Sequence, residues 1–144
     1  MRPDLSRKAG WRGRFAAVVH DWQSRPFAPG VTDCGLFAAA CVEAITGEDL
    51  AAEWRHAYTS EEEARDLMKS RGLASPLALA RATLPAIAPA RMIPGDVVVL
   101  PRAPGYAGGF AVCQGRCLLA VAPLSGLTAL PRRAARWAFA VGDH

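Results

Sequence analysis

The stretch PGVTDCGLF, residues 29–37, is the part of the sequence that decides the fold. Its Pro-Gly pair predicts a turn, and Asp33 suits a helix N-cap because its carboxylate can accept a hydrogen bond from a backbone N–H of the first turn. Apolar residues then recur at helical spacing, at Cys34, Phe37, Ala38, Cys41, Val42 and Ile45. This pattern predicts a core helix that begins at Cys34 and ends at Gly47.

Cys34 admits two interpretations. At the first position of a helix, the positive end of the helix dipole favours the thiolate, which makes Cys34 a candidate catalytic nucleophile. A free cysteine is also, in many proteins, simply a small buried hydrophobic residue. A cysteine nucleophile needs a positioned base, commonly His, so the placement of a base decides between the two interpretations.

The composition limits the class of protein. A chain of 144 residues, 51% of them hydrophobic, is large enough for one domain with its own core. No apolar run has the length of a transmembrane helix and no segment resembles a signal peptide, so we expect neither a membrane span nor Sec export. We expect the four cysteines to be free thiols. The net charge of +4 is not accompanied by aromatic residues interleaved with the arginines, so we expect no nucleic-acid partner.

The first ninety residues predict mainly helices. Residues 1–10 predict a flexible basic arm, and apolar spacing predicts a helix over 11–22. Segment 48–58 has acidic residues first and basic residues last, an order that a helix dipole favours. A capping box at 60–63 begins another helix, and Ser75 precedes a further short one.

The rest of the chain predicts strands. Val97-Val98-Val99-Leu100 is a β-branched run between two prolines, which indicates a buried strand. Two apolar runs flank a Gln-Gly-Arg turn and predict a hairpin. Helices followed by an antiparallel sheet make an α+β domain over residues 11–144. The predicted strands are 97–100, 110–113, 117–121, 127–130 and 137–141.

Metal and cofactor sites are not expected. Cys113 and Cys117, with His56 or His144, have one spacing that zinc sites use, but the usual second pair of ligands is missing. We interpret these cysteines as inert strand residues. The acidic run at 61–63 is interpreted as compensation of a helix dipole.

The turn Asp33-Cys34-Gly35 at the head of a core helix, with Gly95-Asp96 before the valine run, resembles the NlpC-type papain-like cysteine peptidases. The resemblance implies a papain-like α+β fold. It also implies a cysteine nucleophile at Cys34, a histidine base on the strand after the first, and a third polar residue that orients the base.

The layout from about residue 11 to residue 141 resembles more closely a family of small phage tail proteins with this fold. This resemblance implies a protein of the tail tip or hub, synthesised in the bacterial cytoplasm and located in the tail of a phage or gene-transfer particle. It implies partners among other tail proteins, of the hub, distal tail or tape-measure type. The shared residues are Trp22, Pro26, Phe27, Asp33, Cys34, Gly47, Asp49, Tyr58 and Trp137.

The sequence departs from the peptidase pattern at the base. The peptidases begin the relevant segment with His in the form His-Val-Gly-Ile-x-x-Gly, and Gly109 stands at that place here. His20, on the first predicted helix, is the candidate replacement, with Tyr106 or Asp96 as lesser ones. The sequence has no Asn, which removes one common orienting residue. Since general acid–base help contributes roughly 10²–10⁴ in rate, we do not expect an efficient peptidase.

Three hypotheses result. The first is a structural or assembly component of a phage-like tail on an inactive NlpC-type fold, with Tyr106, Trp22, Arg12 and Arg14 as candidate contact residues. The alternative is a peptidoglycan-directed cysteine peptidase or amidase that uses Cys34 as nucleophile. The third is an unrelated cytoplasmic α+β domain that shares only the Asp-Cys turn.

Overall fold

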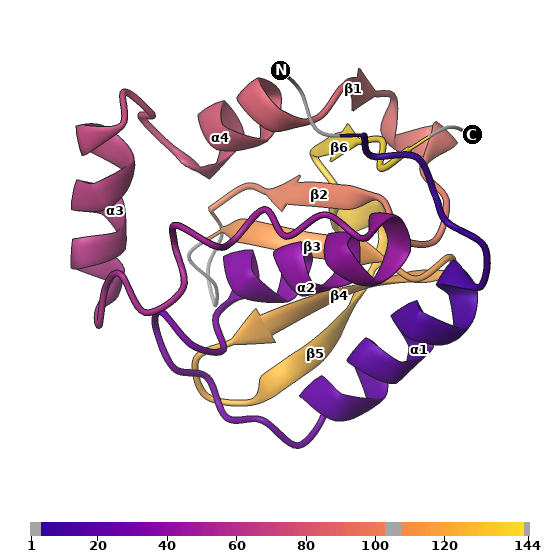
Figure 1. The fold of residues 1–144 in the computed structure, drawn as a ribbon, viewed down its shortest axis with the longest axis horizontal. Coiled ribbons are helices and arrows are strands. Elements are labelled where there is room, and N and C mark those ends of the chain that lie inside the picture. Colours follow the sequence, from indigo (N-terminus) through magenta and orange to yellow (C-terminus); the bar gives the residue numbers. More distant parts are fainter. Residues whose placement is uncertain (1–3, 103–107, 143–144) are drawn as a thin grey trace.

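The computed structural model describes residues 4–102 and 108–142 as an α+β domain in which helices precede an antiparallel sheet (Figure 1). The predicted fold class is therefore confirmed. The helices are α1 (Trp11–Trp22), α2 (Cys34–Thr46), α3 (Glu61–Ser70) and α4 (Pro76–Thr83), with short 3-10 helices η1 (Pro89–Arg91) and η2 (Arg132–Ala134). The strands are β1 (Ala86–Ile87), β2 (Val97–Leu100), β3 (Gly109–Cys113), β4 (Cys117–Ala122), β5 (Gly126–Pro131) and β6 (Trp137–Phe139).

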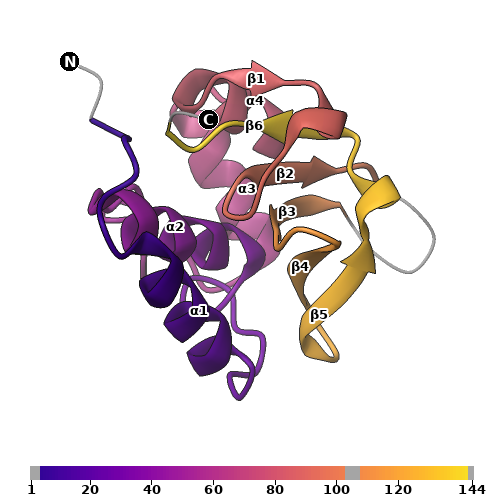
Figure 2. The same ribbon diagram turned by 90° about the vertical axis from the view of Figure 1, so that its right-hand side faces the viewer.

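The six strands form one antiparallel sheet in the order β1-β6-β2-β3-β4-β5. Successive strand residues point to opposite faces. In β2, Val97 and Val99 therefore join the core under α1 and α2, which cover one face of the sheet (Figure 2). Val98 and Leu100 join a second core on the other face, closed partly by Met92 beside η1. Burial on both faces explains why β2 is a continuous apolar run.

Helix α2 lies at the centre of the fold and packs on β3 and β4. Phe37, Cys41 and Ile45 are fully buried on the predicted apolar stripe. Trp22 of α1 meets Phe37 edge-on, with ring centroids 5.3 Å apart. Gly47 ends α2 in the left-handed conformation, at φ 83°, as the sequence predicts.

The segment 48–58, predicted as helical, forms consecutive turns instead. The Asp49 carboxylate accepts from the backbone N–H of Ala51 at 3.0 Å and also from both terminal nitrogens of Arg55. His56 has a left-handed φ of 62°, which a continuous helix does not allow. Asp49 and Arg55 therefore stabilise a turn, although the order of charges in this segment predicted a helix.

Part of the predicted flexible arm lies on the domain. Arg7 donates from Nη2 to Asp96 Oδ1 at 3.0 Å, from Nε to the Val141 carbonyl at 2.8 Å and from Nη1 to the Pro94 carbonyl at 2.6 Å. The Lys8 backbone N–H also donates to the Ile45 carbonyl at 2.9 Å. Residues 4–10 are therefore fixed by partners within the chain itself.

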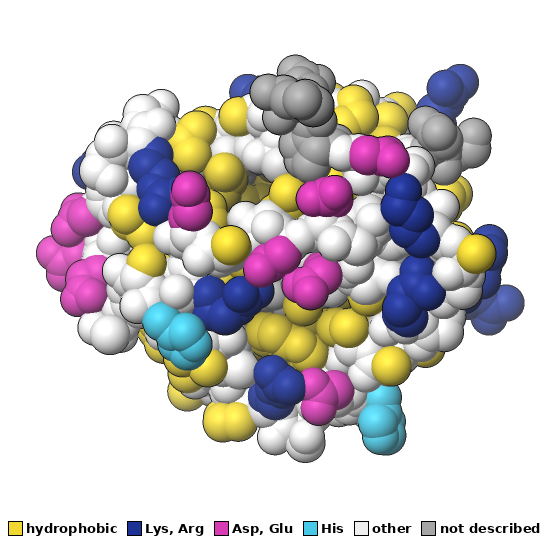
Figure 3. Space-filling view, viewed as in Figure 1, with side chains coloured by type: hydrophobic (Ala, Val, Ile, Leu, Met, Phe, Trp, Pro, Cys, Tyr) yellow, Lys and Arg dark blue, Asp and Glu magenta, His cyan; other side chains and the backbone are white. Residues whose placement is uncertain are grey.

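Lys and Arg side chains gather along one side of the molecule, over α1 and the N-terminal segment (Figure 3). Arg12 and Arg14 lie on α1. None of the helices in the described residues is long and apolar enough to cross a membrane.

Candidate functional site

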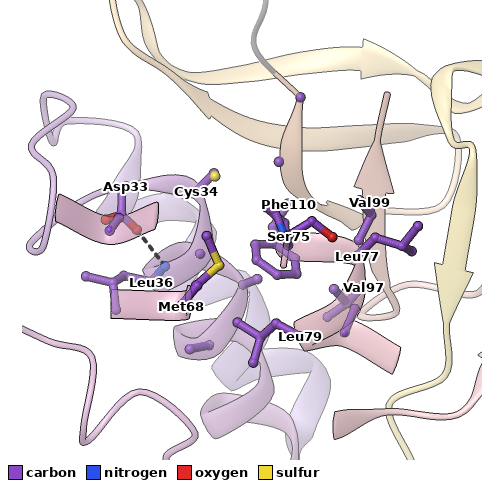
Figure 4. Close-up of a pocket in the computed structure, with 18 of the residues that line it drawn as sticks. Asp33, Cys34, Leu36, Met68, Ser75, Leu77, Leu79, Val97, Val99 and Phe110 are labelled. Atoms are coloured by element: carbon purple, nitrogen blue, oxygen red, sulfur yellow. Dashed lines mark hydrogen bonds between the residues drawn. The ribbon is translucent and has the colours of Figure 1, made fainter. Parts of the chain in front are cut away.

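The site begins at the turn before α2, where the Asp33 carboxylate is saturated with hydrogen bonds. Its Oδ1 accepts from the Leu36 backbone N–H at 2.9 Å, the N-cap bond that the sequence predicts (Figure 4). Its Oδ2 accepts from the Gly30 backbone N–H at 2.9 Å and from the Tyr58 hydroxyl. Asp33 is buried, so these three donors replace its water. The arrangement fixes the start of α2 and with it the position of Cys34.

Gly30 is required by a close approach of two chain segments. Its φ is +78°, and a Cβ atom there would lie 2.1 Å from the Tyr58 carbonyl oxygen. Burial and the bond to Asp33 raise the pKa of Tyr58, so that its hydroxyl stays protonated and donates. The sequence analysis noted Tyr58 only through the phage-tail resemblance and missed this bond.

Cys34 is half-buried at the head of α2. Burial is the main cause that raises its pKa to about 11, and the carboxylates of Asp33 and Glu61 add to the effect. The backbone N–H groups of Phe110 and Gly35 lower the pKa by a smaller amount. Of the two interpretations of Cys34, these surroundings favour the uncharged buried residue over the activated thiolate.

Gly109 lies directly against the Cys34 sulfur. A Cβ atom built on Gly109 would be 2.9 Å from Cys34 Sγ, and the φ of Gly109 is +108°, where side chains are rarely found. The peptidase resemblance places Gly109 where the histidine base would stand. The backbone conformation there also disfavours any residue other than glycine.

The described histidines lie away from this thiol. His20 is exposed on α1 and does not line the pocket that contains Cys34. His56 lines a separate, smaller pocket beside Trp22 and Arg25. His144 and Tyr106 lie outside the described residues. Within residues 4–102 and 108–142, the structure brings no histidine to the Cys34 pocket.

Two further candidates from the sequence are structural. Asp96, considered as a partner for the thiol, is fully buried elsewhere and accepts from Arg7, from the Ile93 N–H at 2.9 Å and from the Val141 N–H at 3.0 Å. Trp22, considered as a contact residue, is buried in the core against Phe37.

The two candidate arginines on α1 differ in their contacts. Arg14 donates from Nε to the Ala44 carbonyl at 2.7 Å and so links α1 to the end of α2. Arg12 is exposed, with its guanidinium 4.5 Å from the centre of the Trp11 ring. Both arginines are exposed, and Arg14 in addition stabilises the packing of α1 on α2.

A pocket of about 880 Å³ adjoins Cys34. It lies between α2, α3, α4 and the strands β2 and β3, and its wall is mainly apolar. Cys34 and Asp33 stand at one end, and Leu77, Val97 and Val99 at the other (Figure 4). The pocket was not predicted from the sequence, because it depends on the distance between α3 and the sheet.

Cys113 and Cys117 face opposite sides of the sheet. Cys113 is buried in the core beside Met92, while Cys117 packs against the core under α2. No group of three or more potential metal ligands is found among the described residues. The two cysteines therefore do not converge on a shared ligand position.

A family model described as "Domain of unknown function (DUF6950)" matches residues 6–141. The chain accordingly belongs to the DUF6950 family. A search of curated proteins found no match.

Proposed function

We propose that this DUF6950 protein is a non-catalytic domain of papain-like type that serves as a structural or assembly component of a phage-like tail, in the tip or hub region. The observation that carries the loss of catalysis is the contact between Gly109 and Cys34. Gly109 has no side chain that could take the thiol proton, and a Cβ atom built there would already lie 2.9 Å from Cys34 Sγ.

The state of the thiol supports the same proposal. A pKa of about 11 leaves only about one thiol in 10⁴ ionised at pH 7, and the thiolate is the nucleophile. No described histidine lines the pocket, so the usual base that accepts the Cys34 proton and the usual acid that protonates a leaving amine are not supplied there.

The residues shared with phage tail proteins support a structural use of the fold. Asp33 and Tyr58 bind each other, Gly47 ends α2, and Asp49 holds the turn with Arg55. Each of these residues stabilises the scaffold without needing a substrate. Such a pattern fits a domain retained for its shape and its partners.

The tail assignment is tested by mass spectrometry of intact particles purified from cells that carry the gene. The proposal predicts peptides of this chain in a constant ratio to the other tail proteins after density-gradient purification. Antibody labelling should place the chain at the tail tip. Particles that lack the chain, while the chain is abundant in the cell lysate, would contradict the proposal.

The alternative, a peptidoglycan peptidase or amidase, is favoured by one observation: Cys34 lines a large pocket. The test is release of new amino groups from purified peptidoglycan by the wild-type chain, with Cys34→Ser as the matched control. We expect no release above the Cys34→Ser background. Turnover that disappears in Cys34→Ser would establish the enzyme and reject the non-catalytic proposal.

A further inference from the structure

The pocket beside Cys34 measures about 880 Å³ and is partly open to solvent. Sites for small molecules span roughly 300–1,000 Å³ and are lined mostly by apolar side chains with a few polar groups. The pocket has the size and the lining of such a site.

Helix α3 forms one wall without being packed into the core. None of its residues is buried, although Ala64, Leu67 and Met68 form an apolar stripe along it and both Ala64 and Met68 line the pocket. An amphipathic helix normally buries such a stripe. Hydrophobic side chains are visible in a hollow between α3 and α4 (Figure 3). An occupant of the pocket would bury the stripe.

The long part of the pocket offers apolar contacts and little hydrogen bonding. Met68, Leu77, Leu79, Val97, Val99 and Phe110 surround it. The Ser75 hydroxyl already caps α4 by accepting from the Ala78 N–H. A peptide inserted here would leave its backbone N–H and C=O groups without partners, which is costly. A hydrocarbon chain has no such groups, so the wall fits a hydrocarbon chain better than a peptide.

The charged residues that line the pocket favour an anion. Arg65 and Arg102 contribute to the lining, and neither forms an ion pair with another described residue. Glu61, at the start of α3, and Asp33 also line it, but Asp33 is saturated by three donors. Neither carboxylate forms an ion pair with Arg65 or Arg102. A carboxylate or phosphate head on the ligand would give these two guanidinium groups a partner.

We infer that the pocket beneath α3 binds an anionic amphiphile, with the hydrocarbon chain among Met68, Leu77 and Val97 and the acidic head at Arg65 and Arg102. This inference does not rest on the proposed role in a tail, since it follows from the pocket alone. A free fatty acid and an anionic phospholipid share the required chemistry.

The test is displacement of 11-dansylaminoundecanoate from the full chain, followed by fluorescence below the critical micelle concentration. Dodecanoate should bind saturably with one molecule per chain, and about tenfold or more tightly than decanoate, because each buried methylene contributes about fourfold. Dodecyltrimethylammonium, with the same chain and a positive head, should bind at least about tenfold more weakly than dodecanoate. Equal binding of the two, or the absence of saturable binding, would overturn the inference.

Two matched variants locate the site. Ala64→Trp fills the pocket from α3 and should reduce dodecanoate affinity at least about tenfold, while Ala17→Trp, on the exposed face of α1, should leave it unchanged. Circular dichroism melts establish that both variants fold. A double variant, Arg65→Gln with Arg102→Gln, should remove the preference for the anionic head. Equal affinity of Ala64→Trp and Ala17→Trp would place the ligand elsewhere and reject the site.

Two additional arms separate the sources and the competing occupant. Flotation with phosphatidylglycerol vesicles, compared with phosphatidylcholine vesicles, distinguishes a membrane lipid from a free fatty acid as the ligand. Binding to either source supports the inference if Ala64→Trp abolishes that binding. Sedimentation velocity tests whether a second copy covers the pocket. A dimer that Ala64→Trp dissociates, together with no amphiphile binding, would overturn the inference.

Discussion

Two buried aspartates, Asp33 and Asp96, occupy similar turns and perform different tasks. Each follows a Pro-Gly pair, and each carboxylate accepts hydrogen bonds from backbone N–H groups. Asp33 is completed by a neutral donor, the Tyr58 hydroxyl, whereas Asp96 is completed by the guanidinium of Arg7.

The difference separates a local cap from a long-range anchor. The partners of Asp33 lie within 25 residues along the chain, and they fix the start of α2 and the thiol beside the pocket. Asp96 joins Arg7 from 89 residues away to the backbone of Val141, so it ties both ends of the chain to the sheet. Of the two aspartates, Asp96 is fully buried, and it is the one with a charged partner, Arg7.

The largest effect is expected at the anchor. Arg7→Ala leaves the Asp96 carboxylate buried without its cation, and removal of one member of a buried ion pair typically costs about 3–5 kcal/mol. The free energy of unfolding from urea titration measures the loss. Arg12→Ala, which removes an exposed arginine of the same segment, should cost less than about 1 kcal/mol. Equal losses in the two variants would show that Arg7 is not an anchor.

A smaller loss is expected at Gly30 in the Asp33 turn. Gly30→Ala meets the Tyr58 carbonyl in addition to its positive φ, whereas Gly72→Ala has nearly the same φ and no atom within 4 Å. The left-handed conformation alone costs about 1–2 kcal/mol in each variant. Overpacking at Gly30 should add about 1–3 kcal/mol. Thermal melts of both variants measure the difference, and its absence would mean that the turn can relax away from Tyr58.

The smallest loss is expected from Tyr58→Phe, which removes one hydrogen bond to Asp33. We expect about 1.5–3 kcal/mol, because the acceptor is a carboxylate. A double-mutant cycle with Asp33→Asn isolates the pairwise contribution of the two side chains. Additive losses in that cycle would contradict a direct bond between them.

The local cap at Asp33 could be predicted from the sequence, whereas the long-range anchor at Asp96 could not. The N-cap at Asp33, the stripe of α2 and the Ser60 N-cap of α3 depend on residues a few positions apart, and the structure contains each of them. The Glu63 carboxylate accepts from the Thr59 N–H and not from Ser60, so the predicted capping box is present only in part. Asp96 was considered only as a lesser candidate partner for the thiol, because nothing near it in the sequence points to Arg7. The same limit hid the pocket, since spacing predicts the apolar stripe of α3 but not how closely that stripe packs.

The chemistry of Cys34 was also beyond the sequence, for a related reason. Its place on the helix was predicted, and the dipole favours the thiolate. Its pKa depends on burial and on Glu61, which only the folded chain brings near. Gly109 is the instructive contrast: alignment with the peptidase motif predicted its place opposite the thiol, because that motif carries long-range information.

The most direct test of the account is the pH profile of Cys34 alkylation by iodoacetamide. Tandem mass spectrometry distinguishes Cys34 from Cys41, which lies on the same tryptic peptide. Because the pKa is raised to about 11, the rate constant should increase about tenfold for each pH unit up to about pH 10 and should be unchanged in His20→Gln. A rate that reaches its plateau below pH 8, and that falls in His20→Gln, would demonstrate an activated thiol with a histidine partner and contradict the account.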